Sequence, residues 1–417
     1  MWKKLSKQEI NEAVFSALRQ NRHYKHEHVL GIPVSHLDDK VFYDNFEMLK
    51  DAPFLSTMVD NPNHIGCHTL GESEAFFAGT QAIERELVAM CAEDIFKGDE
   101  GEFDGYVSSG GTETNIQAVW IFRNLFNREF GAKNEEIAVI CSDDTHYSGA
   151  KSANLLNVNY ITVPVDQETR KIDVKILHQT VAEAKARGIK YFAGIVNMMT
   201  TMFGSVDNPQ DYIDAFQAND VKFHLHVDAA FGGFMYPFSN NNNPVNFQNP
   251  YITSIGMDAH KMAQAPFGTG IFLIRKDYMQ YALTEEAQYV SGMDMTLVGS
   301  RSGANAISVW MILKTYGYYG WTEKINMLLY RTNWLCKKLD QLGVEYYRDE
   351  HSNLVTMKSK FIPTELAQKY ALVPESHTKE NKWYKIVVMD HVSIDALNLF
   401  LEELEQSLAQ TDEGVLV

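Results

Sequence analysis

Between residues 136 and 227 the sequence alternates short apolar runs with amphipathic helical stretches. The apolar runs are EIAVIC (136–141), NYITVPV (159–165), KYFAGIVN (190–197) and KFHLHV (222–227), and the last three are separated by VKILHQTVAEAKARG (174–188) and PQDYIDAFQAND (209–220). Strands that are joined by helices normally form a parallel sheet with helices on both faces. We therefore expect an α/β domain, with a mostly parallel sheet sandwiched by helices.

The rest of the chain suggests further segments, because 417 residues exceed what one compact core usually holds. A long helical region begins beyond residue 300, and GVEYYRDEHSNLVTMKSK (343–360) has the alternating character of short antiparallel strands. We expect an N-terminal segment (1–60), a large domain (61–305) and a smaller α+β C-terminal domain (306–417). The asparagine-rich run SNNNNPVNFQNP (239–250) is predicted to be a surface loop.

Charge and composition exclude several classes of protein. The 37 basic and 54 acidic side chains leave a formal net charge of -17, which repels nucleic acid and anionic membranes. No stretch approaches about 20 uninterrupted apolar residues, and no apolar signal region follows the N-terminal lysines. The four cysteines form no CxxC pair, which favours buried free thiols in a reducing compartment over a disulfide framework or a metal site: Cys67, Cys91, Cys141 and Cys336. We expect a cytoplasmic protein.

Three short motifs carry the chemical signal. In HVDAAFGG, a buried strand ends at Asp228, at the edge where α/β sheets place ligands. In DAHKM, Lys261 stands among small and apolar residues, where a lysine can lose its charge and act as a Schiff-base amine. In SSGGTETN (108–115), glycines precede a helix that begins near Thr112, so free N–H groups are available to an anion such as a phosphate.

Each motif alone also has an ordinary structural explanation. A glycine-rich turn before a helix is usually only a turn, an aspartate can cap a helix, and most lysines are solvated at the surface. The joint occurrence of the three motifs in this order is what indicates a cofactor site.

The order and residues of these motifs resemble those of the fold-type I enzymes that use pyridoxal 5'-phosphate (PLP), and specifically the group II amino acid decarboxylases, over about residues 60–320. The resemblance implies that Lys261 carries the cofactor as a Schiff base and that Asp228 pairs with the protonated pyridine nitrogen. It implies that His146, in DDTHYSGAK, stacks on the ring and that Ala230 contacts the opposite face. The phosphate contacts that it implies are Gly111, Thr112, His260 and Ser300.

The family resemblance also implies a homodimer with shared active sites, because Ser300 corresponds to a phosphate ligand from the neighbouring subunit. The segment EEAQYVSGMDMTLVGSR (285–301) lies where the family has a mobile catalytic loop. Tyr289 matches the loop tyrosine that protonates the decarboxylated carbon, and a tyrosine there favours simple decarboxylation over oxidative deamination. The alternative for Tyr289 is a surface aromatic residue that anchors a loop.

One departure from the family pattern lies in NMMTTMFGSVD. Met199 stands where the family commonly has a glycine before two threonines, and Thr200 and Thr201 are kept. Either the backbone tolerates a side chain there or the floor of the pocket differs. Thr201 is the candidate for a hydroxyl near the cofactor.

The stretch HTLGESEAFFAGTQAIERE (68–86) most resembles the short-chain branch that includes archaeal tyrosine and aspartate decarboxylases. The candidate substrate residues are His68, Phe76, Phe77 and Arg301, although adjacent phenylalanines more often fill a core. The predicted reaction is PLP-dependent removal of the α-carboxylate of an L-amino acid, aromatic or acidic, to give the amine and CO2. The alternatives are another PLP-dependent carbon–carbon lyase, acting on a phosphorylated amino alcohol, and a PLP-binding protein without turnover.

Overall fold

A computed structural model describes residues 78–285, 292–376 and 380–414, together with residues 28, 30–31, 40, 63–64, 69 and 71. The chain divides into two compact units. The larger unit comprises residues 35–330 and 347–355, and the smaller comprises residues 1–34, 331–346 and 356–417. The divisions expected at residues 60 and 305 stay predictions. One boundary between the two units falls between residues 330 and 331, inside one long helix.

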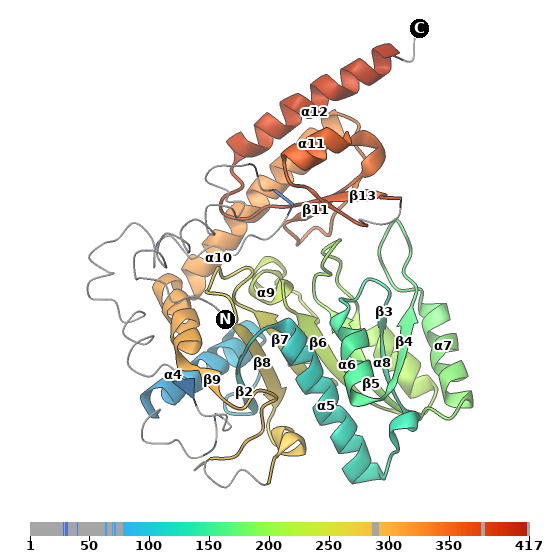
Figure 1. The fold of residues 1–417 in the computed structure, drawn as a ribbon, viewed down its shortest axis with the longest axis vertical. Helices are drawn as coiled ribbons and strands as arrows, with labels where there is room; N and C mark the ends of the chain where they lie inside the picture. The colour runs from blue at the N-terminus through green and yellow to red at the C-terminus, as the bar shows by residue number, and fades with distance from the viewer. Residues whose placement is uncertain are drawn as a thin grey trace, which may run out of the picture. The chain divides into compact units, whose positions relative to one another are not determined.

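A seven-stranded sheet forms the centre of the larger unit (Figure 1). Its order is β2-β8-β7-β6-β5-β3-β4. β8 runs antiparallel to β2 and β7, and the other neighbouring pairs are parallel. The strands are β2 (Phe103–Ser108), β3 (Ile137–Ser142), β4 (Asn159–Val163), β5 (Tyr191–Asn197), β6 (Lys222–Ala229), β7 (Ile252–Asp258) and β8 (Gly270–Arg275). The predicted mostly parallel α/β sheet is confirmed.

Helices cover both faces of this sheet because of the order in which its strands are joined. The connections through α5 (Gly111–Phe130) and α6 (Ser148–Leu156) step toward β4, whereas those through α7 (Val174–Ala186) and α8 (Pro209–Ala218) step back toward β6. Right-handed crossovers that step in opposite directions place their helices on opposite faces. Accordingly, α5 packs against α6 and α7 packs against α8.

Side chains that alternate along the strands fill both layers of the core. On β5, Ala193 and Ile195 join the buried cluster that includes Phe122 and Phe126 of α5. On the opposite face of β5, the Phe192 ring lies 5.2 Å from that of Phe216 on α8, centroid to centroid. Burial of each such side chain stabilises the fold by about 1.5–3 kcal/mol, so the two apolar layers hold the sheet in place.

The C-terminal region contains a second sheet, of order β10-β11-β13-β12, in which β12 and β13 pair antiparallel. Its elements are β10 (Tyr346–Tyr347), β11 (Leu354–Lys358), β12 (Val373–Pro374), β13 (Trp383–Val387), α11 (Thr364–Lys369) and α12 (Ile394–Gly414). The predicted short strands of residues 343–360 and the α+β character of the C-terminal region are confirmed. The long helix α10 (Gly303–Gln341) is interrupted at Gly317, where φ is +64°.

Several expectations about helices and loops can be compared with the structure. The helix α4 (Ala78–Ala89) is continued by a π-helical turn. The strands β7 and β8 were not predicted from the sequence. The run 239–250 begins at the last residue of a short helix and is otherwise a loop. The prediction of a surface loop is wrong in part, because Val245 and Phe247 are buried. Asn243 accepts a hydrogen bond from the Val245 amide within this loop.

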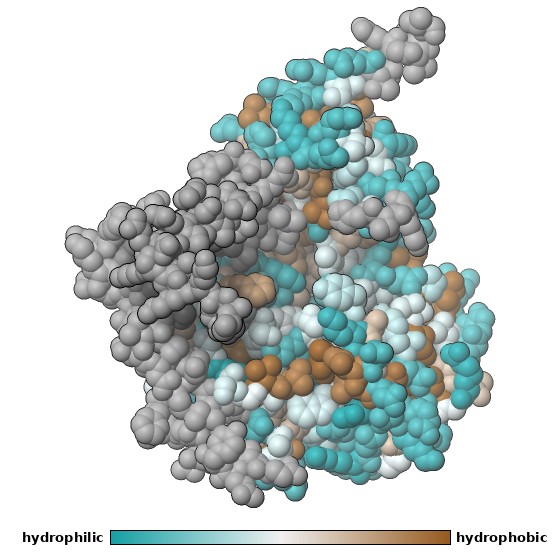
Figure 2. All heavy atoms as spheres, in the orientation of Figure 1, coloured by the Kyte–Doolittle hydropathy of each residue, from teal (hydrophilic) through white to brown (hydrophobic). Residues whose placement is uncertain are grey.

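The remaining elements and surface features complete the larger unit. They include α9 (Tyr236–Ser239) and a short antiparallel pair of β1 (Asn63–His64) with β9 (Arg301–Ser302). Figure 2 shows hydrophobic residues gathered in a band across the region of α5 and α6, where Leu155 is exposed.

Cys91, Cys141 and Cys336 are buried free thiols, as predicted. None of the described helices combines the length and the apolar character that a membrane span needs.

Candidate active site

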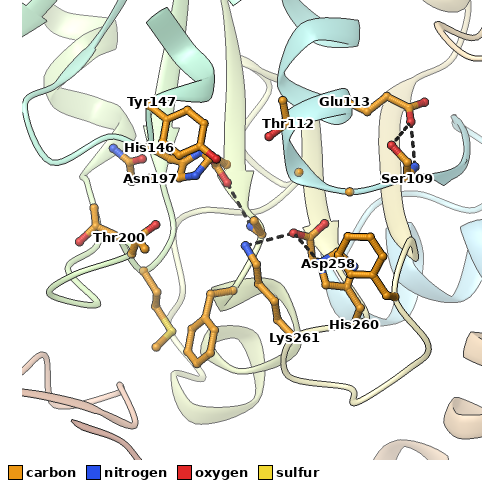
Figure 3. A pocket seen from close by; sticks show the side chains of 18 residues that line it. Ser109, Thr112, Glu113, His146, Tyr147, Asn197, Thr200, Asp258, His260 and Lys261 are labelled. Carbon is orange, nitrogen blue, oxygen red and sulfur yellow. Dashed lines mark hydrogen bonds and ion pairs between the residues drawn. The ribbon is translucent and has the colours of Figure 1, made fainter. Parts of the chain in front are cut away.

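A cavity of about 400 Å³ lies in the larger unit, at the edge where the parallel strands end. The walls come from the segments that follow β2, β3, β5, β6 and β7 (Figure 3). Because the carboxyl ends of parallel strands meet at one edge of a sheet, side chains that are far apart in the sequence converge there. The structure thus brings Asp228, Lys261 and His146 to one cavity.

Lys261 is held at the cavity wall by a carboxylate that the sequence analysis did not single out. β7 ends at Asp258, and the Nζ atom of Lys261 lies 3.1 Å from Asp258 Oδ2. The Asp258 side chain is 3% exposed, whereas that of Lys261 is 31% exposed. The Nε2 atom of His260 lies 3.7 Å from the same carboxylate oxygen, and burial lowers the pKa of His260. The lysine amine therefore faces the cavity with its counter-ion behind it.

Asp228 lies close to the end of β6 and its carboxylate is fixed on both sides. The Oδ1 atom accepts a hydrogen bond from the Ala230 amide at 3.1 Å, and Oδ2 accepts one from Asn115 Nδ2 at 2.8 Å. Ala230 also lines the cavity. A carboxylate held this way is a preorganised acceptor for a proton-bearing group of a ligand.

His146 lies across the cavity from Lys261, in the loop between β3 and α6 (Figure 3). Its Nδ1 atom is 2.8 Å from the Ser148 hydroxyl oxygen, and the Ser148 amide donates to the same nitrogen at 3.3 Å. Burial lowers the pKa of His146, although the Asp228 carboxylate opposes that shift. The ring is therefore neutral at pH 7, which suits it to stack on a flat ligand.

The glycine-rich turn between β2 and α5 forms an anion cradle. Gly110 has a φ of +149°, and a Cβ atom on Gly111 would come within 2.9 Å of the Ala230 Cβ. The amides of Gly111 and Thr112 donate to no backbone carbonyl of the described residues, as is usual for the first N–H groups of a helix. Glu113 accepts hydrogen bonds from the Ser109 amide and hydroxyl at 2.8 and 2.6 Å, which braces the turn.

These groups fit PLP. Asp258 Oδ1 and His260 Nδ1 are buried polar atoms that have no hydrogen-bond partner among the described residues, and both residues border the glycine cradle. A phosphate suits the cradle, a ring nitrogen suits Asp228, and an aldehyde suits the amine of Lys261. Buried polar atoms left without partners are expected where a ligand completes the site.

Met199 and the two threonines after it lie at the same cavity. Met199 has a φ of +68°, in the left-handed region that favours glycine, so the backbone accommodates a side chain there in a conformation that glycine adopts without strain. Thr200 is buried and its hydroxyl bonds to that of Ser205 at 2.7 Å. Thr201 is exposed and also lines the cavity, and its role as a hydroxyl near the cofactor stays a prediction.

Two expected site residues do not line this cavity. Ser300 is exposed, at a position that its own chain does not place at the cavity. Arg301 is buried and forms an ion pair with Glu84, and its Nη1 atom also donates to the Val107 carbonyl at 3.3 Å. Because this guanidinium is committed to a buried carboxylate, Arg301 is not placed to bind a substrate in the described cavity.

Four expected residues lie outside the described part of the chain: Tyr289, His68, Phe76 and Phe77. Conversely, the structure adds Asp258, Asn115 and Phe267 to the surroundings of the cavity. Asp258 could have been found as the last residue of the strand that precedes Lys261, had ITSIGMD been recognised as a strand. The polar Asn115 inside an amphipathic helix next to the glycine turn was a weaker signal.

Comparisons with known proteins agree with this geometry. Residues 33–360 match the model of the pyridoxal-dependent decarboxylase conserved domain. The chain is 49% identical to a tryptophan decarboxylase of Clostridium sporogenes over 97% of each protein, and 31% identical to a probable L-tyrosine/L-aspartate decarboxylase of Methanococcus maripaludis over 79% of this chain and 85% of that one.

Among solved structures, the fold is similar to that of a sphingosine-1-phosphate lyase of Burkholderia pseudomallei, with a TM-score of 0.80 and 18% identity over 98% of this chain and 92% of that one. This likeness concerns the fold alone. The family match, together with the lysine, the aspartate and the glycine cradle at one cavity, places the chain in a defined group. The chain belongs to the pyridoxal-dependent decarboxylases, and it is a PLP-dependent amino acid decarboxylase.

Proposed function

We propose that this enzyme decarboxylates an aromatic L-amino acid, with L-tryptophan as the first candidate, to the amine and CO2. The observation that carries the substrate is the 49% identity to a tryptophan decarboxylase across nearly the whole of both chains. The sequence left aromatic and acidic amino acids open as substrates, and the cavity lining supports the aromatic class.

The described lining of the cavity suits an apolar side chain better than an acidic one. Lys261 is the only lysine or arginine among the described lining residues, and it is the amine expected to hold the cofactor. The carboxylates of Asp228 and Asp258 would repel an acidic substrate side chain. Apolar and aromatic lining residues are Met199, Phe231, Phe267 and Tyr147.

The roles that we propose for the residues follow from their positions. PLP, when bound, supplies a ring that accepts the electron pair released as CO2 leaves. Lys261 would supply the amine that holds the cofactor. Asp228 holds a proton on the ring nitrogen, and His146 covers one face of the ring. Tyr289, outside the described residues, stays the predicted donor of the proton to the substrate carbon.

The phosphate would be held by the cradle of Gly111 and Thr112, with His260 beside it. Ala230 would contact the ring opposite His146, and Thr201 would offer a hydroxyl near it. All of these residues line the one cavity. The alternative reaction, cleavage of a phosphorylated amino alcohol, would require further cations for a second phosphate, and the described lining has none besides Lys261.

We also propose a homodimer with shared active sites. Phe267 lines the cavity and yet is 84% exposed, and Tyr147 is 65% exposed. Large aromatic side chains exposed beside a cavity are typical of surfaces that a partner covers. Ser300, exposed and outside its own chain's cavity, is then available to the site of the second chain. The free thiols of Cys91, Cys141 and Cys336 fit the proposed cytoplasmic location.

A mixing experiment tests the shared site. We expect a Lys261→Ala chain and a Ser300→Trp chain to be inactive separately. Refolded together, they should regain about a quarter of the wild-type sites, because half of the dimers are mixed and each mixed dimer has one intact site. Failure to regain activity, with mixed dimers present, would show that Ser300 serves its own chain or no site.

The direct test of the function is CO2 release by the purified, PLP-loaded enzyme across the L-amino acids, with the amines identified by mass. We expect tryptamine from L-tryptophan and much slower release from L-aspartate and L-glutamate. Release from an acidic amino acid alone would overturn the proposed substrate class. Absence of CO2 from every amino acid, beside intact PLP absorption, would overturn the proposed decarboxylation.

A further inference from the structure

A hydrogen-bonded network lies behind the proposed cofactor site, and Asn115 is at its centre. Asn115, on the first turns of α5, is fully buried. Its Nδ2 atom is 2.8 Å from Asp228 Oδ2 and 2.7 Å from the Ser148 hydroxyl oxygen, and its Oδ1 atom is 2.8 Å from His226 Nε2. One amide thus contacts the carboxylate at the cavity and, through Ser148, the ring of His146.

The carboxylate determines which way this amide points. The carboxylate of Asp228 can only accept, so the atom of Asn115 that faces it must be the NH2 group. The oxygen of Asn115 therefore faces His226, which must donate from Nε2. The Nδ1 atom of His226 then accepts from the Ser254 hydroxyl, 2.8 Å away. Burial lowers the pKa of His226 to about 4, which agrees with a neutral ring that has one donor and one acceptor.

The same reasoning extends to the other side of the amide. The Ser148 oxygen accepts from Asn115, which leaves the hydroxyl proton of Ser148 free to be donated to Nδ1 of His146. The Ser148 amide also donates to that nitrogen. A nitrogen that accepts two hydrogen bonds has no proton of its own, so the proton of the neutral ring must be on Nε2. This Nε2 atom makes no hydrogen bond with the described residues and is left for the cavity.

We propose that Asn115 is a positioning residue that sets both partners of the cofactor ring. It holds Asp228 as an oriented acceptor and, through Ser148, holds His146 as the neutral tautomer with its Nε2–H available to the cavity. This inference rests on the proposed roles of Asp228 and His146. Two functions would then depend on one amide: the retention of a proton on the ring nitrogen by Asp228, and the hydrogen-bond donor that His146 offers to the cavity. Asn115 itself does not line the cavity.

Three variants separate these effects. Asn115→Ala removes the bonds to both Asp228 and Ser148. Ser148→Ala removes the hydroxyl that donates to His146 and leaves the bond from Asn115 to Asp228 in place. The matched control is Ser152→Ala, one turn further along α6, because the Ser152 hydroxyl is equally buried but donates to the backbone carbonyl of Ser148, at 2.7 Å.

The first readout is the tautomer of His146 in the full chain without PLP, from imidazole nitrogen chemical shifts assigned by their absence in a His146→Phe variant. We expect the Nε2–H form in the wild type and in Ser152→Ala, and a mixture with the Nδ1–H form in the other two variants. An Nδ1–H ring in the wild type, or an unchanged ring in Ser148→Ala, would overturn the inference. If Asn115→Ala does not fold, Ser148→Ala decides.

The second readout is the dissociation constant of PLP, measured by titration of the visible absorption. We expect it to rise about tenfold in Asn115→Ala, less in Ser148→Ala and not at all in Ser152→Ala, because only the first variant loses the bond that orients Asp228. Equal affinity in Asn115→Ala and wild type would contradict the inference. Neither readout requires turnover, so failure of the proposed substrate would leave both measurements standing.

Discussion

Two ion pairs in the larger unit differ in how exposed their side chains are and in whether they border the cavity. At the cavity, Asp258 pairs with Lys261, yet Asp258 Oδ1 has no partner among the described residues and Lys261 is 31% exposed. In the second pair, Glu84 binds Arg301 and also accepts from the Val107 amide at 2.7 Å. The side chains of Glu84 and Arg301 are 0% and 4% exposed.

This difference distinguishes an ion pair at a ligand site from an ion pair that only stabilises the fold. A buried ion pair survives only when most of its polar atoms are satisfied, and the pair of Glu84 with Arg301 also has the Tyr106 ring 5.0 Å from the guanidinium carbon. The cavity pair instead borders a cavity, with Asp258 Oδ1 unbonded among the described residues and Lys261 partly exposed, so a ligand can complete its bonding. We call the two the open pair (Asp258 and Lys261) and the closed pair (Glu84 and Arg301).

The largest expected effect comes from breaking the open pair. Lys261→Ala removes the amine that is proposed to hold PLP, so we expect CO2 release to fall by at least about a thousandfold, with loss of the visible absorption of bound cofactor. The circular dichroism of the folded chain should be retained. Lys190→Ala, which removes an exposed lysine paired with Glu136, is the control and should keep full turnover. Substantial turnover by Lys261→Ala would refute the assignment of the open pair.

The closed pair should respond in stability instead. Arg301→Met leaves the carboxylate of Glu84 buried without its cation, and we expect this to lower the free energy of unfolding by about 3–5 kcal/mol. The double variant Glu84→Gln with Arg301→Met should recover most of that loss, because no charge is then left buried. Urea denaturation measures both. A double variant as unstable as Arg301→Met alone would mean that packing, rather than charge, explains the cost.

A smaller, pH-dependent effect is expected at His226. Like the closed pair, His226 is fully buried and hydrogen bonded, but its partner Asn115 also bonds to Asp228 at the cavity. Burial lowers the pKa of His226 from 6.5 to about 4. The unfolded chain therefore takes up this proton below about pH 6.5, whereas the folded chain does so only near pH 4, and the folded state loses about 3 kcal/mol of stability as the pH falls across this window.

The His226→Gln variant cannot take up this proton. Its disadvantage in unfolding free energy relative to the wild type should therefore shrink as the pH falls from 7 to 4, because all other titrating groups are common to both proteins. Urea denaturation at several pH values measures this difference. A difference that stays constant with pH would show that His226 is not a neutral buried ring.

The smallest expected effect concerns Met199, which lines the same cavity as the open pair and has a φ of +68°. Glycine adopts this conformation without strain, whereas an alanine there costs about 1 kcal/mol or more. We expect Met199→Gly to be more stable than Met199→Ala by about 1 kcal/mol in thermal denaturation, although both lose the same buried side chain beyond Cβ. If the alanine variant is the more stable, the left-handed backbone is not a source of strain at the cavity.

The local sequence was sufficient for much of the fold. The strands β3 to β6 and the helices α7 and α8 were predictable, because a parallel strand buried on both faces needs an apolar run and its crossover helix needs a periodic one. ITSIGMD and GIFLIR, which form β7 and β8, were missed. Their burial comes from neighbouring strands on both sides, and the serine and glycine of ITSIGMD weaken the local pattern.

The sequence by itself determined the class of site. Asp228 and His146 each follow a predicted strand, and parallel strands end at one edge of a sheet. Lys261 and the glycine turn were identified by the residues and order of the family's motifs. Only the tertiary structure decided which partners these groups have. Nothing in the neighbourhood of Arg301 in the sequence indicates Glu84, and nothing near Asp228 indicates Asn115, because both pairs join residues more than a hundred positions apart. Ionic and hydrogen-bonding partners depend on distances of a few ångströms between side chains, and only the packed core sets those distances.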